Sequence, residues 1–275
     1  MRRFITSLLL ALTCYTSYAQ TETQNEAPWW VQQFRISAGL YLPVNNTVLK
    51  VDGNNGNTGT EINFENDLGF AKSSATFIGD VQFRISRRSR IAFSYYNIAR
   101  SSVHTLDKDI NFGDTTYNVN TTVHATFNTA IYQVSYGYSI LSRPTYEAGV
   151  AIGAHIIGGH VALELEGNTT TTPNSFNFTA PLPDLEIWGG YAISRHFALQ
   201  GSLGYLGLTI GSVHGSIFTY DASLMYNIVD NLSVALGYSG LNFEVNAKIN
   251  DNDSHFKWGY NGLTLKASYS FGKSW

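Results

Sequence analysis

Cysteine is almost absent from this chain: the 275 residues include only one, Cys14. It lies in an apolar run near the amino terminus that we expect to be removed with a signal peptide. The mature chain then has no cysteine, which excludes a disulfide framework and a thiolate metal site. We expect no metal and no cofactor, and we assign no catalytic residue.

Charged residues and long apolar runs are also scarce. Charged residues make up 13% of the chain, about half of their usual share in soluble domains, whereas hydrophobic residues reach 44% and aromatic residues 14%. After residue 19 no stretch approaches the ~18 apolar residues of a membrane-spanning helix. A net charge of −3 without a basic stripe argues against nucleic acid as a partner. This composition suits a barrel that faces lipid; a soluble β-sandwich or lipocalin-like barrel is the alternative.

The first residues predict export. Two arginines precede the apolar run 4–14, and Ser17-Tyr18-Ala19 places small residues at −3 and −1 of a cut after Ala19. This is the pattern of a secretory signal peptide. We expect residues 1–19 to be the signal peptide, 20–32 a periplasmic segment and 33–275 a barrel in the bacterial outer membrane.

An alternation of apolar and polar residues is the main structural signal. In residues 76–86, Val81 and Phe83 share one face and Asp80, Gln82 and Arg84 the other. A period of two predicts a strand with one apolar and one polar face. Short and long connections alternate between such segments, as in transmembrane β-barrels. The predicted strands are 33–44, 75–86, 90–101, 125–139, 145–157, 183–193, 197–208, 216–228, 232–245 and 258–271, with long loops at 45–74, 102–124, 158–182 and 246–257.

The predicted ninth strand departs from this pattern. Leu241 and Phe243 have the opposite parity to Leu236 and Tyr238. A β-bulge near Gly240 would return all four side chains to one face. We therefore expect a bulge there.

The charged face should line the lumen, because a charge at the bilayer midplane costs about 2–4 kcal/mol. Charges inside a narrow barrel need partners, so we expect ion pairs and hydrogen bonds that fill the lumen. Tyr41, Tyr96, Gln82, Gln133 and Gln200 share this face. The predicted lumenal polar network consists of Arg35, Asp80, Arg84, Glu147, Glu186, Asp221 and Lys266.

The carboxyl end reads GLTLKASYSF followed by GKSW, with aromatic residues at Tyr269, Phe271 and Trp275. This end resembles the last strand of bacterial outer-membrane barrels, whose final aromatic is read by the barrel assembly machinery. The resemblance implies that this machinery is a partner and that Tyr269, Phe271 and Trp275 are the candidates for the assembly signal.

The stretch TEINFENDLGF at 60–70, the segment SRRSRIAFSYY and Arg100 resemble a group of uncharacterised small outer-membrane proteins, with a barrel architecture like that of OmpA and OmpW. The resemblance implies a barrel and no known chemistry. The alternation itself predicts an all-β fold, a transmembrane antiparallel up-and-down β-barrel of about ten strands (8–12), and an even strand number places both termini in the periplasm.

Enzymatic function has weak support. No GxSxG elbow and no HExxH motif occurs. A histidine near an acid could act as a general base only if the two groups lie within hydrogen-bond reach. The candidates are His104 with Asp107 and Asp109, His155 and His160 with Glu164, and His255 with Asp251 and Asp253.

The sequence therefore predicts an integral outer-membrane barrel that is structural or a narrow passage for small solutes, with surface-exposed loops. Its expected partners are outer-membrane lipid and lipopolysaccharide, the assembly machinery and small solutes. Acidic loops could hold cations that bridge lipopolysaccharide. The alternatives are a lipid A- or peptide-modifying barrel enzyme and an adhesin-like surface-binding barrel.

Overall fold

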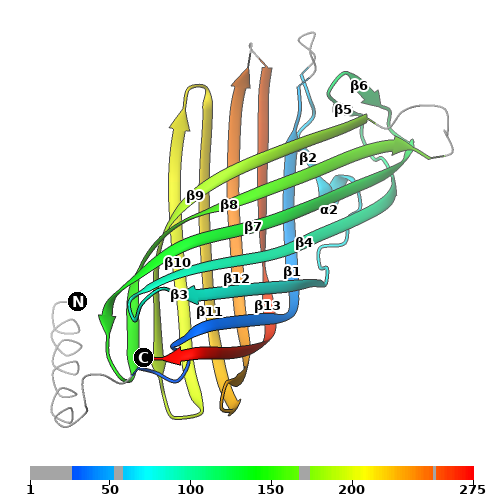
Figure 1. Ribbon diagram of the computed structural model, residues 1–275. Helices are drawn as coiled ribbons and strands as arrows, with labels where there is room; N and C mark the ends of the chain where they lie inside the picture. Colours follow the sequence, from blue (N-terminus) through cyan, green and yellow to red (C-terminus); the bar gives the residue numbers. More distant parts are fainter. Residues whose placement is uncertain (1–26, 53–57, 167–173, 250–251) are drawn as a thin grey trace, which may run out of the picture.

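The computed structural model describes residues 27–52, 58–166, 174–249 and 252–275, so the predicted signal peptide lies outside the described residues. In the described part, ten antiparallel strands form a ring that the pairing of the first with the last closes (Figure 1). The predicted fold class is confirmed. The strands are β1 (Gln32–Lys50), β3 (Thr76–Arg84), β4 (Ser89–Thr105), β7 (Thr122–Ser142), β8 (Tyr146–Leu165), β9 (Asn174–Ala192), β10 (Phe197–Ile210), β11 (Val213–Val229), β12 (Leu232–Ile249) and β13 (Asn252–Ser274).

Tight turns join the strands in pairs at one end of the barrel. Ile85 N donates to Ser89 O at 2.9 Å, and Ile193 N donates to Phe197 O at the same distance. Ala27, Pro28, Trp29, Val31 and Trp275 line one hollow at this end. Short turns face the periplasm in outer-membrane barrels, so we call this the periplasmic end and the opposite one the outer end.

The strands are much longer than a bilayer requires. Nine of the ten contain 14 to 23 residues, whereas about 9–11 residues cross the hydrocarbon. The predicted long loops at 158–182 and 246–257 are therefore wrong over most of their length, because β8, β9, β12 and β13 run through them. Within the described residues, no helix is long and apolar enough to cross a membrane.

The polarity of the two barrel faces inverts along each strand, as β7 illustrates. Toward the periplasmic end, Val134 is exposed on the outside and Gln133 lines the lumen. Toward the outer end, Phe127 is fully buried inside and His124 is exposed outside. The apolar face thus points to lipid in one half of the barrel and into a dry core in the other half.

This inversion corrects the predicted bulge. The pairing of β12 with β11 and with β13 runs without a register shift through Gly240. Leu241 and Phe243 are only 2% exposed, and they point inward with regular alternation. The parity of the apolar residues changes because the environment changes: beyond the membrane the outside is water and the inside is the core.

The outer half of the lumen is filled by this apolar core. It receives side chains from the long strands, from the loop 58–75 and from the β5 (Ile110–Phe112) and β6 (Thr115–Tyr117) hairpin. The largest members that are fully buried include Phe64, Phe112, Phe127, Trp258 and Tyr260. Burial of each such aromatic stabilises the folded state by about 1.5–3 kcal/mol or more.

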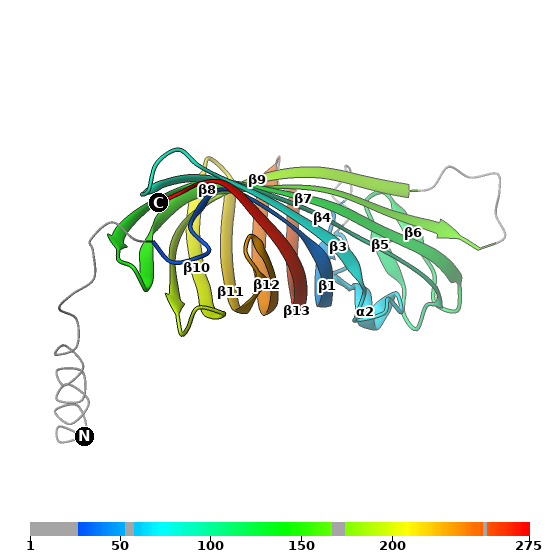
Figure 2. The ribbon, with the colours of Figure 1, turned by 60° about the horizontal axis from the view of Figure 1, so that its bottom comes forward.

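The loop 58–75 completes the wall above the short strand β3. The β3–β4 ladder reaches only to Ile78–Tyr96. Above it, β2 (Ile62–Asn63) pairs with β1, and the one-turn helix α2 (Phe64–Asp67) lies beside β1 (Figure 2). The Asn63 side chain caps α2 by accepting from Asn66 N at 2.9 Å. The described residues of the predicted loop 45–74 therefore contribute to the wall, through the end of β1, β2 and α2.

A second gap in the ladder lies between β9 and β10. Their pairing stops at Leu185–Tyr205, and the rest of β9 pairs with β8 alone. Pro181 and Pro183 lie on this edge of β9. Proline has no N–H to donate and is tolerated at a sheet edge, where it discourages a further strand from pairing.

Candidate functional site: a polar chamber in the lumen

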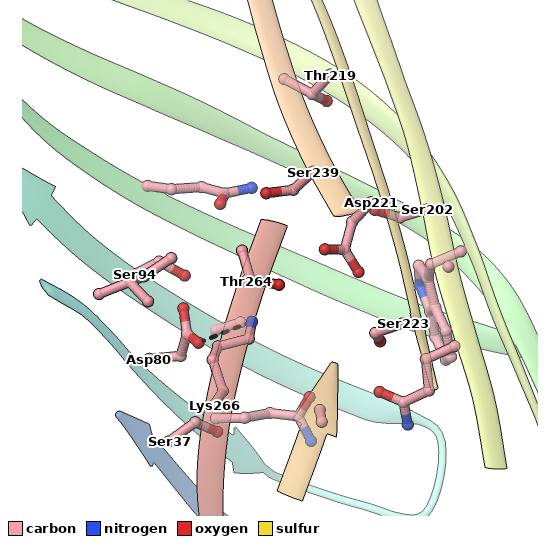
Figure 3. A pocket seen from close by; sticks show the side chains of 18 of the residues that line it. Ser37, Asp80, Ser94, Ser202, Thr219, Asp221, Ser223, Ser239, Thr264 and Lys266 are labelled. Carbon is pink, nitrogen blue, oxygen red and sulfur yellow. Dashed lines mark hydrogen bonds and ion pairs between the residues drawn. The ribbon is translucent and has the colours of Figure 1, made fainter. Parts of the chain in front are cut away.

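The periplasmic half of the lumen encloses a polar chamber of about 260 Å³. All ten strands contribute side chains to it, and the inner wall carries many hydroxyl groups (Figure 3). Small residues of the inner wall, among them Ser202 and Ala235, leave room for the chamber. The hydroxyl groups come from Ser37, Ser94, Ser135, Ser202, Thr219, Ser223, Ser239, Thr264 and Ser268.

Three tyrosines separate the chamber from the outer apolar core. The rings of Tyr41, Tyr96 and Tyr260 pack edge to face with centroids 5.9–6.0 Å apart. The hydroxyl groups of Tyr96 and Tyr260 are hydrogen bonded, and Tyr41 donates to Ser239 O at 3.2 Å. Tyrosine suits this boundary because its ring can pack in the core while its hydroxyl stays among polar groups.

Trp30 forms the floor of the chamber. Its side chain is 3% exposed and packs against Ala198, Met225 and Ala235 at the periplasmic ends of β10, β11 and β12. The neighbouring Trp29 packs edge to face on Trp30 with centroids 5.6 Å apart. The described residues that precede β1, 27–31, therefore lie inside the periplasmic mouth of the barrel.

Five of the seven residues of the predicted polar network line the chamber. Lys266 Nζ lies 3.1 Å from Asp80 Oδ2 (Figure 3), and Arg35 Nη2 donates to Gln82 Oε1 at 3.2 Å. Asp221 projects from β11 into the same space. The chamber members are Arg35, Asp80, Glu186, Asp221 and Lys266, and Tyr41, Tyr96, Gln82, Gln133 and Gln200 also line it.

The other two predicted residues form a buried cluster beside the periplasmic turns. Arg84 donates two hydrogen bonds to Glu147, at 2.9 and 2.7 Å, and both side chains are 1% exposed. Arg87 adds a third contact to Glu147 at 3.1 Å, and Ser139 donates to the same carboxylate. This cluster joins β3, the β3–β4 turn, β7 and β8, so its geometry suits stabilisation.

Sequence reasoning missed two important members of the chamber, Arg90 and Trp188. The Arg90 guanidinium stacks 3.5 Å above the centre of the Trp188 ring. The alternation pattern already places both residues on the lumenal face, because Arg90 has the parity of Tyr96 in β4 and Trp188 has the parity of Glu186 in β9. Only the pairing of distant strands places one on the other.

The proposed groups of histidines and acids do not assemble as the sequence suggested. His155 points inward, where its Nδ1 lies 3.7 Å from Asp184 Oδ2, whereas His160 is exposed outside and contacts Asn177. Glu164 lies opposite His124 in the β7–β8 ladder. Neither His155 nor His160 therefore forms a site with Glu164.

In the two remaining groups no hydrogen bond joins the histidine to a proposed acid within the described residues, and His104 Nε2 is buried without a hydrogen-bond partner. Asp109 near His104 accepts a hydrogen bond from Val119 N at 2.7 Å. His255 is hydrogen bonded to Asn246, and Asp251 lies outside the described residues. In the part of the chain that the structure describes, no three His, Cys, Asp or Glu side chains gather to hold a metal ion.

The candidate assembly residues divide into two groups. Tyr269 and Phe271 point outward from β13, and Phe271 stacks on Phe34 of β1 with centroids 5.1 Å apart. Gly272 adopts φ +88°, and beyond it Trp275 turns into the periplasmic mouth and packs near Trp29 and Val31.

Comparison with known proteins gave matches to solved structures alone. No family model matches the chain, and no curated protein matches it in sequence. The outer membrane protease OmpT from Escherichia coli superposes with a TM-score of 0.54 and 11% identity, over 92% of this chain and 99% of that one. The fold is that of a bacterial outer-membrane β-barrel. Its location is the outer membrane, in agreement with the apolar exterior of the periplasmic half.

Other outer-membrane barrels match less closely. Ail from Yersinia pestis, in complex with a heparin analogue, gives a TM-score of 0.34 at 12% identity, over 86% of this chain and 99% of Ail. OprG from Pseudomonas aeruginosa gives 0.36 at 8% identity, over 91% of this chain and all of OprG.

Proposed function

We propose that the protein is a closed, structural outer-membrane barrel that carries a rigid extension above the membrane and presents its loops at the cell surface. One observation carries this proposal: the outer half of the lumen is packed with apolar side chains, among them Phe64, Phe127 and Trp258, each 0% exposed. A solute would have to displace this core to cross the barrel.

The shape of the extension supports the same function. The strands continue as a hydrogen-bonded sheet well beyond the length that lipid requires. The β5–β6 hairpin and α2 pack on its core through Ile110, Tyr117 and Phe64. A packed core holds such surface elements in one arrangement, as a scaffold for contacts with lipopolysaccharide or other surface molecules requires.

Conductance in planar bilayers tests this proposal. We expect refolded wild-type protein to give no unitary ion steps at 100 mV, while a general porin in the same bilayer conducts. Deletion of residues 60–75, which removes α2 and part of the core, should produce steps and so demonstrate insertion. Steady wild-type steps would contradict the closed barrel and favour the second candidate, a narrow solute passage, for which the chamber is the supporting observation.

A further inference from the structure

Two charged side chains of the chamber lack a hydrogen-bonded partner among the described residues. The Arg90 guanidinium contacts the face of Trp188, and no described carboxylate lies within ion-pair distance of it. No described residue donates a hydrogen bond to Asp221, although Lys266 pairs with the adjacent Asp80. Burial of unpaired charges is costly, so both groups are suited to an additional partner.

The charges of the chamber wall balance. A free anion could pair with Arg90 but would leave Asp221 unpaired, and a free cation would do the reverse. A neutral sugar would compensate neither charge. The wall carries three cationic side chains, Arg35, Arg90 and Lys266, and three carboxylates, Asp80, Glu186 and Asp221.

Further polar atoms of the wall have no hydrogen-bond partner within the described residues. Thr264 Oγ1, Trp188 Nε1 and His155 Nδ1 are buried and make no hydrogen bond within the described structure. Their side chains are at most 8% exposed, and all three residues line the chamber. Buried polar atoms normally have a hydrogen-bond partner, so these three atoms are suited to a polar molecule in the chamber.

The volume limits the size of that molecule. A chamber of about 260 Å³ is smaller than the roughly 300–1,000 Å³ of sites for drug-sized ligands. It could hold about eight or nine waters at about 30 Å³ each. A molecule with the dimensions of a free amino acid would fit, whereas a disaccharide or a lipid would not.

We propose that the chamber binds a small zwitterion of the free amino acid class, with its carboxylate on Arg90 and its ammonium group on Asp221. Ser202 of β10 pairs in register with Asp221 of β11 on one side and with Trp188 of β9 on the other. Because Arg90 stacks on Trp188, this register brings Arg90 and Asp221 to the same part of the chamber. The ligand enters from the periplasm by displacement of Trp30, since the tyrosine layer and the apolar core block the outer side. The site is thus a pocket that opens to the periplasm, and it does not require a conducting barrel.

Ligand-observed NMR and calorimetry on the refolded full barrel test this proposal. The probes are glycine and L-glutamine as zwitterions, acetate and methylammonium as single charges, and glucose as a neutral polar molecule. We expect saturable binding of at least one zwitterion, and at least tenfold weaker binding of the other three probes. Absence of zwitterion binding, or preferred binding of glucose, would overturn the proposal.

Single substitutions test whether Arg90 and Asp221 form the binding site. Arg90→Gln and Asp221→Asn should each weaken zwitterion binding at least tenfold, whereas the exposed turn variants Arg195→Gln and Asp230→Asn should leave it unchanged. Trp30→Ala should accelerate association with less than a threefold change in Kd. Arg90→Lys serves as a second variant if Arg90→Gln fails to give a heat-modifiable barrel. Unchanged affinity in the folded Arg90 and Asp221 variants would refute the assignment.

Discussion

Arg100 Nη1 lies 2.6 Å from Glu65 Oε1, and both side chains are less than 5% exposed. Glu65 also accepts from Thr47 N at 2.9 Å, and Arg100 Nη2 donates to Thr47 Oγ1 at 2.6 Å. The three residues connect α2, β4 and β1 at the place where β3 is absent from the wall. This buried network therefore fixes the loop 58–75 as a part of the barrel.

Removal of one partner should destabilise the extension strongly. We expect Arg100→Met to lower the free energy of unfolding by about 3–5 kcal/mol, because the Glu65 carboxylate stays buried without its partner. The measurement is urea unfolding of the refolded protein in detergent, together with protease cleavage within residues 58–75. The partly exposed pair Lys108–Asp67 is the control: Lys108→Gln should cost at most about 1 kcal/mol. Equal losses in the two variants would contradict this account.

Because polarity inverts along β7, substitution by lysine should affect stability differently at two positions on the outward face of this strand. Val134→Lys places a charge in the lipid-facing band and should cost about 2–4 kcal/mol in liposomes. His124→Lys lies ten residues nearer the outer end, where the face is in water, and should change stability by less than about 0.5 kcal/mol. Comparable costs at both sites would show that the lipid band extends to the outer end.

The cluster around Glu147 should support folding at the periplasmic turns. Glu147→Gln removes the charge that Arg84 and Arg87 contact. We expect a loss of about 3–5 kcal/mol in the free energy of unfolding, since the Arg84 guanidinium stays buried. Urea unfolding measures it, with Glu166→Gln as the matched control away from the cluster. A loss below 1 kcal/mol would mean that the cluster contributes little to stability.

The orientation of the carboxyl-terminal aromatics leads to a prediction about assembly. Phe271 points outward beside Phe34 and is accessible on the barrel exterior, whereas Trp275 packs in the mouth. Phe271→Asn should lower the amount of heat-modifiable barrel in the membrane fraction several-fold, and Trp275→Asn should lower it much less. The reverse order would assign the assembly signal to Trp275.

Alternation with a period of two is a local property, so the sequence predicted the strands and the lumenal face of most charged residues in the periplasmic half. It placed Asp80, Asp221 and Lys266 on the lumenal face before any pairing was known. It also contained the inversion of polarity in β12, but local reasoning explained Leu241 and Phe243 by a bulge. The correct explanation needs the interior beyond the membrane, which many strands build together.

Alternation along the chain determined by itself that this protein is a lipid-facing barrel with charges inside, since burial of charge in hydrocarbon is too costly. Tertiary structure alone decided what the lumen contains. The stacking of Arg90 on Trp188, the position of Trp30 in the mouth and the apolar core depend on strand register and on chain segments far apart in sequence. Contacts of that range have no signature in any single stretch of residues.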